Sequence, residues 1–217
     1  MIIARTPLRI SFFGGGTDYS DWIQEHGGQV LSTTINKYNY ITCRYLPPFF
    51  KHKYRLAYSR LEHVEKFEDI QHPSIKACIE YLKITEGIEM HYDADLPART
   101  GLGTSSAFTV GFLNALSTLL AQSKNNHTLA KEAIHVEQSI IEEIVGSQDQ
   151  VNAAFGGLNH IVFHKDGNID VNPVALEKER LSELEGNLLL FFTGIVRTAS
   201  EIAKDQVQNT SRNEPAL

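Results

Sequence analysis

The sequence predicts an α+β or mixed α/β domain, and three observations lead to that prediction. Short apolar and β-branched runs gather in the N-terminal part, whereas longer runs at helical spacing dominate the middle of the chain. Two alternating segments around Asp166 and Gly167 then predict a hairpin. The chain has 217 residues, 42% of them hydrophobic, which is enough to bury one core without disulfides or a structural metal.

The first half of the chain is expected to alternate strands with two helices. A buried strand ends at the glycine run 14–16, and a short helix capped by Thr17 or Asp18 follows it. An Asn36-Lys37 turn is expected to join the next two strands. The expected strands are 8–13, 30–35, 38–45, 54–58 and 88–94, and the expected helices are 17–25 and 73–82.

The second half is expected to be mainly helical. Small and apolar residues fill a first long helix, and Thr128 caps a second one that Gly146 ends. A short helix closed by Gly156 and Gly157 precedes the hairpin, and a strongly apolar strand comes after it. The expected helices are 105–121, 128–145, 149–155 and 198–208, and the expected strands are 159–164, 168–171 and 187–193.

Composition excludes several classes of protein. The formal net charge of −6 argues against a generic nucleic-acid binder, which needs a basic surface. No apolar run approaches the ~20 residues of a membrane span, and Arg5 and Pro7 do not fit a signal peptide. Cys43 and Cys78 fit a reducing compartment. We expect a cytoplasmic protein that binds a small molecule, without nucleic-acid or membrane partners; its oligomeric state is not predicted.

Residues 44–60 mix basic and aromatic side chains, and three interpretations are open. Such mixing can bind single-stranded nucleic acid, and it can also form a wall for a nucleotide base. The third interpretation is a β-hairpin with a charged outer face. We favour the hairpin because the whole chain is acidic.

The segment Gly101-Leu-Gly-Thr-Ser-Ser106 opens the first long helix and predicts a phosphate site. Glycines let a ligand approach the backbone, and the unpaired amides and dipole of a helix N-terminus attract anions. One hydroxyl among Thr104, Ser105 and Ser106 can hold magnesium or a phosphate oxygen; the alternative is a plain loop with hydroxyl capping. The sequence has no Gly-Lys-Ser/Thr, which excludes the P-loop class, and no third glycine of the Rossmann fingerprint, which excludes that class. It also has no His-Arg-Asp, which excludes the protein kinases.

Three further features are candidates for chemistry. The cluster 14–18 suits the recognition of sugar hydroxyls, or it is a glycine turn with an Asx cap. Glu137 can complete a magnesium site with Ser105, and Asp149 can orient or deprotonate an attacking hydroxyl. A solvated helix face is the alternative explanation for Glu137 and its neighbouring glutamates.

These segments together resemble the GHMP kinases over essentially the whole chain. Pro7-Leu-Arg-Ile10 through Gly14-Gly-Gly-Thr-Asp-Tyr19 is similar to the first family motif, and residues 96–107 are similar to the second, the phosphate loop. The triple glycine, Gln148-Asp-Gln150 and Phe155-Gly-Gly157 resemble the sugar-kinase branch that includes heptose 7-phosphate kinase and fucokinase. Gly15-Gly16 departs from the Glu-His of galactokinase-like members. The resemblance implies a GHMP-kinase N-terminal domain, like domain 2 of ribosomal protein S5, with a mixed sheet packed with helices.

The resemblance also implies roles for matched residues. Asp149 would be the catalytic base or orienting carboxylate, and Arg9 would lie beside it. Ser105 and Glu137 would bind Mg²⁺. The ATP phosphates would lie against Pro97, Arg99, Thr100, Gly101, Leu102, Gly103, Thr104, Ser105 and Ser106. The sugar would contact Gly15, Gly16, Thr17, Asp18 and Gly157. From its position after an apolar strand, Arg197 is expected to contact the sugar's own phosphate; an ion pair with a nearby carboxylate is the alternative.

The expected function is therefore ATP- and Mg²⁺-dependent phosphoryl transfer to a hydroxyl of a sugar or sugar phosphate. A heptose 7-phosphate is the leading acceptor, and an unphosphorylated sugar such as fucose is the second. Residues 1–217 are expected to form the ATP-binding domain alone, because the third glycine-rich motif of the family is missing. The contrasting expectation is a truncated, non-catalytic module that binds a sugar or a nucleotide.

Overall fold

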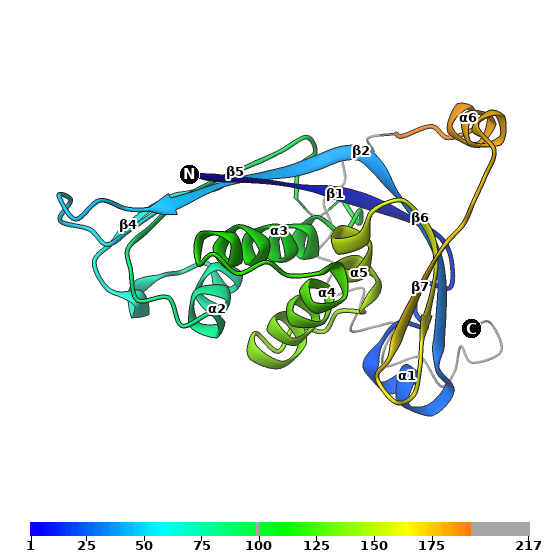
Figure 1. Cartoon of the computed structure of the whole chain (residues 1–217), viewed down its shortest axis with the longest axis horizontal. Helices are drawn as coiled ribbons and strands as arrows, with labels where there is room; N and C mark the ends of the chain where they lie inside the picture. Colours follow the sequence, from blue (N-terminus) through cyan, green and yellow to red (C-terminus); the bar gives the residue numbers. More distant parts are fainter. Residues whose placement is uncertain (99, 192–217) are drawn as a thin grey trace.

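A seven-stranded mixed sheet forms the body of the protein (Figure 1). The computed structural model describes residues 1–98 and 100–191. The strand order is β4-β3-β5-β2-β6-β7, with β1 paired to β2; β3 and β5 run parallel, and the other described pairings are antiparallel. The strands are β1 (Ile2–Phe13), β2 (Gly28–Tyr45), β3 (Tyr54–Ala57), β4 (Leu61–Val64), β5 (Ile88–Ala94), β6 (Leu158–Phe163) and β7 (Ile169–Pro173).

Four helices cover one face of this sheet (Figure 1). They are α2 (Pro73–Tyr81), α3 (Thr104–Leu119), α4 (Asn126–His135) and α5 (Gln148–Phe155). Helix α1 (Ser20–His26) lies near the β6–β7 end, and α6 (Lys178–Gly186) lies apart from the other helices. None of the helices in the described part of the chain is both long and apolar enough to span a membrane.

Helix α3 is the centre of the core. Its Phe112, Leu113 and Leu116 are fully buried and belong to the same apolar cluster as Leu8 of β1. Gly111 lets the helix approach β1 closely, because a Cβ there would lie 2.4 Å from the Thr6 hydroxyl oxygen. This tight packing places the N-terminus of α3 beside the middle of β1.

The predicted Asn36-Lys37 turn is wrong. Residues 28–45 form one strand, β2, which pairs with β1 along nearly its whole length. Pro7 pairs with Tyr38 whereas Arg9 pairs with Thr34, so the register shifts between these pairs. A β-bulge therefore accommodates Asn36 and Lys37, the polar residues expected to form a turn.

The predicted 128–145 helix is also corrected. It begins earlier, because the Asn125 side chain caps α4 by accepting a hydrogen bond from the Thr128 amide. Helix α4 ends at His135 and continues as one π-helical turn, Val136–Ile140. Single π turns are common at functional sites, and this one carries Glu137.

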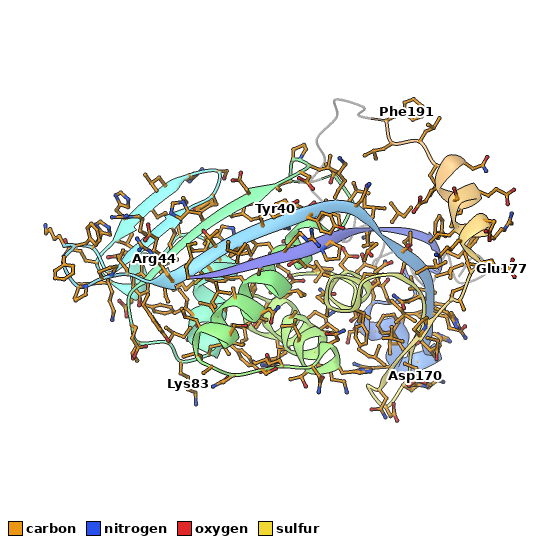
Figure 2. The ribbon with its side chains drawn as sticks, turned by 45° about the horizontal axis from the view of Figure 1, so that its top comes forward. Tyr40, Arg44, Lys83, Asp170, Glu177 and Phe191 are labelled. Carbon is orange, nitrogen blue, oxygen red and sulfur yellow. The ribbon has the colours of Figure 1, made fainter. Side chains whose placement is uncertain are left out.

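The apolar segment expected as strand 187–193 is not a strand in its described part. Residues 187–191 follow α6, and Leu189 and Phe191 are 79% and 76% exposed. Figure 2 shows Phe191 at the edge of the molecule, beyond the sheet. An apolar run becomes a strand only where a neighbouring strand completes its hydrogen bonds. Arg99, Arg197 and the expected 198–208 helix lie outside the described residues.

Candidate active site

An ion pair joins β1 to the start of α5. The Arg9 Nε donates a hydrogen bond to Asp149 Oδ1 at 2.6 Å, and the two side chains are 15% and 23% exposed. The same guanidinium donates to the Gly101 carbonyl at 2.8 Å, and the Arg9 amide donates to the Leu102 carbonyl at 3.0 Å. Arg9 therefore connects the glycine-rich loop to Asp149.

The glycine-rich loop adopts a backbone that requires glycine. Gly101 and Gly103 both have φ of 75°, and Gly103 is the N-cap of α3. A Cβ on Gly103 would lie 3.3 Å from both the Arg9 Cγ and the Asp149 Cγ, whereas a Cβ on Gly101 would point into open space. The loop therefore brings its backbone against the ion pair and leaves its other side free.

The N-terminus of α3 has the features of a phosphate cradle. Its Gly103 cap makes no side-chain hydrogen bond, and no acidic residue occupies the first turn. The first amides of a helix lack intrahelical partners, and the helix dipole favours an anion there. Pro97 and Ser105 are exposed, Thr100 and Leu102 are half-buried, and Thr104 is buried, with its carbonyl accepting from the Asn39 side chain.

Glu137 reaches the same end of α3 from the π turn. It is 1% exposed, and its Oε2 accepts hydrogen bonds from the Ser106 hydroxyl at 2.8 Å and from Gln150 Nε2 at 2.5 Å. Burial raises the pKa of Glu137 to about 7, although these hydrogen bonds oppose the rise. The hydroxyl that contacts Glu137 thus belongs to Ser106, whereas the sequence predicts a pairing of Glu137 with Ser105.

These oxygens fit a magnesium ion. Glu137 Oε1 is buried without a hydrogen-bond partner, so its lone pairs are available to a metal ion. Magnesium prefers oxygen ligands and takes few of them from protein when phosphates and water supply the rest. No group of three or more histidine, cysteine, aspartate or glutamate side chains gathers as a metal site in residues 1–98 and 100–191.

The glycine cluster of residues 14–18 packs against β2. A Cβ on Gly14 would lie 1.8 Å from the Gln29 carbonyl oxygen, and the Thr17 hydroxyl contacts both Gly14 and Gln29. Gly15 is exposed, whereas Gly16, Thr17 and Asp18 are buried. Only part of this cluster is therefore open to solvent.

Gly157, the other expected sugar contact, is tied to β2. Its amide donates to the Thr34 hydroxyl at 2.8 Å, and its carbonyl accepts from the Thr34 amide at 3.0 Å. Gln148 and Gln150, which flank Asp149, received no role from the sequence. They contact Asp18 and Glu137 respectively. A sequence signal for these two contacts does exist: a glutamine with a side-chain amide lies on each side of Asp149, in the first turn of an expected helix.

Comparison with known proteins identifies the fold. Residues 73–157 match the sequence profile described as "GHMP kinases N terminal domain". The chain contains a GHMP kinase N-terminal domain. A solved D-glycero-D-manno-heptose 1-phosphate kinase from Bacteroides thetaiotaomicron has a TM-score of 0.81 and 28% identity, covering 100% of this chain and 72% of that one. The α+β class with a mixed sheet and the family resemblance are both confirmed.

Sequence relatives of the domain are named as sugar kinases. The chain is 31% identical over 215 residues to D-glycero-alpha-D-manno-heptose 7-phosphate kinase of Campylobacter jejuni. The aligned region covers 93% of this chain and 62% of that relative. The chain is 25% identical to a galactokinase of Pyrococcus furiosus over 94% of this chain and 56% of that protein. The chain thus spans about three fifths of the length of these two relatives.

Proposed function

We propose that this domain serves ATP- and Mg²⁺-dependent phosphoryl transfer to a hydroxyl of a sugar or sugar phosphate, with a heptose 7-phosphate as the leading acceptor. The observation that carries the proposal is the Arg9–Asp149 ion pair beside the N-terminus of α3. It puts a carboxylate and a cation next to a phosphate cradle, and phosphoryl transfer depends mainly on positioning and charge neutralisation. The names of the relatives support the acceptor class.

In the proposed reaction, the first amides of α3 and the 97–106 loop hold the ATP phosphates. The acceptor oxygen forms a bond to the γ-phosphorus while the bond from that phosphorus to the β–γ bridging oxygen breaks. The hydroxyl proton passes to Asp149, and ADP leaves. Arg9 orients Asp149 and offsets its charge. Ser105 and Glu137, with Ser106, would hold magnesium, which neutralises phosphate charge when bound.

The proposed sugar contacts include two glycines. Gly15 and Gly157 are both exposed, and the lack of a side chain at each would let a sugar approach the backbone closely. Arg197, proposed to contact the phosphate of the sugar, lies outside the described residues. Cys43 and Cys78 are buried free thiols, which supports the proposed cytoplasmic location.

An ATP-consumption assay tests the proposal. The gene product is supplied with ATP, magnesium and, in turn, heptose 7-phosphate, fucose, galactose or mevalonate. We expect turnover with the heptose phosphate first and fucose second. Asp149→Asn should lower kcat by about a hundredfold or more while nucleotide binding persists. Nucleotide or sugar binding without turnover of any sugar would support the non-catalytic module instead.

A further inference from the structure

The Asp18 carboxylate lies buried between the glycine cluster and the start of α5. Only 1% of Asp18 is exposed. Its Oδ1 accepts hydrogen bonds from the Gly16 amide at 3.1 Å and from Gln148 Nε2 at 3.3 Å, and its Oδ2 accepts from the Gln148 amide at 3.0 Å. Both carboxylate oxygens are therefore engaged inside the protein, which leaves little of the group for a sugar.

The backbone around Asp18 is fitted to the same segment. The Asp18 carbonyl accepts a hydrogen bond from the Ser147 amide at 2.9 Å. A Cβ on Gly146 would lie 2.0 Å from Asp18 Oδ2, so this close approach needs a glycine. Residues 146, 147 and 148 are thus all packed against Asp18.

Asp18 supplies the cap that α5 lacks. Ser147, the N-cap residue, makes no side-chain hydrogen bond to the helix. The Gln148 amide is one of the first-turn donors without an intrahelical partner, and Asp18 accepts from it. A carboxylate at a helix N-terminus also interacts favourably with the helix dipole. Asp149 is the next residue, so Asp18 holds the backbone from which Asp149 projects.

The Asp149 side chain is restrained from the other direction by Arg9. Arg9 is itself bonded to the phosphate loop through Gly101 and Leu102. Burial raises the pKa of Asp18, the Gln148 amide opposes the rise, and the charge of Asp149 adds to it. Gln148, whose amide Asp18 binds, directly precedes Asp149 in the chain. Asp149 is consequently held at its carboxylate by Arg9 and at its backbone by Asp18.

We propose that Asp18 is a positioning residue for Asp149 and not a contact of the sugar. By capping α5, it keeps the Asp149 carboxylate between Arg9 and the phosphate loop. This inference rests on the proposed kinase function, in which Asp149 receives the proton of the acceptor hydroxyl.

Asp18→Asn tests the proposal, because the new NH₂ group faces donors where an oxygen now accepts. We expect kcat to fall roughly tenfold to a hundredfold, as small displacements of catalytic groups do, with the KM for the sugar changed by no more than about twofold. A residue that binds the sugar would instead raise that KM. Hydrogen exchange followed by mass spectrometry should show faster exchange at the Gln148 amide, a readout that needs no activity.

A paired substitution separates positioning from a general loss of stability. In Asp18→Asn/Gln148→Glu, the new asparagine can donate to the new glutamate, which restores the side-chain pair with reversed polarity. We expect partial recovery of kcat and of amide protection relative to Asp18→Asn. Asp21→Asn is the matched control, since Asp21 is an exposed acidic residue of α1; its kcat and exchange should equal those of the wild type.

The outcomes distinguish this proposal from the kinase function. If the wild type transfers phosphate to no sugar, the kinase function fails, while exchange at Gln148 still tests the cap. If Asp18→Asn raises the sugar KM at unchanged kcat, or leaves exchange at Gln148 unchanged, the positioning role is overturned. If Asp18→Asn does not fold, Gln148→Ala removes only the side-chain contact, and it must show a smaller loss confined to kcat.

Discussion

Substitution of Glu137 by glutamine is expected to change how the stability of this domain depends on pH. Glu137 is 1% exposed, and its Oε1 has no hydrogen-bond partner. A neutral glutamine keeps an acceptor for the Ser106 hydroxyl and the Gln150 amide. It also removes a carboxylate that is costly to ionise in the folded protein.

The size of the effect follows from the pKa. Burial raises the pKa of Glu137 from 4.5 to about 7. Below pH 4.5 the Glu137 carboxyl is protonated in both the folded and the unfolded protein, and above pH ~7 it is ionised in both. The folded state therefore loses stability as pH rises from 4.5 through 7. A pKa difference of about 2.5 corresponds to about 3 kcal/mol between pH 4 and pH 9.

Urea denaturation in EDTA at several pH values measures this effect. Both proteins contain the other titrating groups, so the difference between their stabilities isolates Glu137. We expect Glu137→Gln to gain about 3 kcal/mol over the wild type between pH 4.5 and 8.5, or about 1.5 M in urea midpoint. A difference that stays constant with pH would refute the reasoning, because it would mean that Glu137 ionises as readily in the folded state as in the unfolded one.

Three further outcomes follow from the packing. Gly103→Ala should lower kcat by about tenfold or more, since its Cβ would press on the Arg9–Asp149 ion pair. Gly101→Ala has the same φ of 75° but places its Cβ in open space, so it should cost about 1 kcal/mol of stability and lower kcat less than Gly103→Ala does. Gly111→Ala should destabilise by about 1–3 kcal/mol, measured by urea denaturation, because its Cβ would overlap the Thr6 hydroxyl. Glu89→Gln should destabilise the protein at pH 7 and lose that effect in acid. Burial opposes the ionisation of Glu89, but hydrogen bonds from Arg44, His91 and Arg55 together lower its pKa. The stability that the Glu89 carboxylate contributes is therefore present above pH ~4.5 and is lost as the pH falls through the lowered pKa.

Matched controls decide these cases. Gly186→Ala places a methyl group in open space on α6 and should not destabilise, in contrast to Gly111→Ala. Glu65→Gln breaks an exposed pair with Lys51 and should have little effect at any pH. Equal activity of the Gly101 and Gly103 variants would contradict the contact between the loop and the ion pair. A Glu89→Gln effect that persists in acid would contradict its ionic origin.

Local signals in the sequence predicted most elements of the sheet-and-helix body. The start of α3, the hairpin around Gly167 and helix α2 follow from glycine positions and apolar spacing, which depend on near neighbours. The bulge in β2 and the π turn at Glu137 were missed for a common reason. Each is set by a partner elsewhere in the fold: β1 pairs across the bulge, and Ser106 and Gln150 contact the glutamate.

The sequence by itself determined the fold class, the glycine-rich turn that starts α3 and the place of Asp149 in the first turn of α5, because each depends on backbone preferences within a few residues. Only the tertiary structure decided which groups meet. Arg9 and Asp149 are 140 positions apart, and Asp18 and Gln148 are 130 apart. Such contacts depend on how closely α3 approaches β1 and how closely the segment before α5 approaches Asp18, which Gly103, Gly111 and Gly146 permit. For the same reason the motif predicts a sugar contact for Asp18, whereas only the fold shows that this side chain is buried and bonded to Gln148.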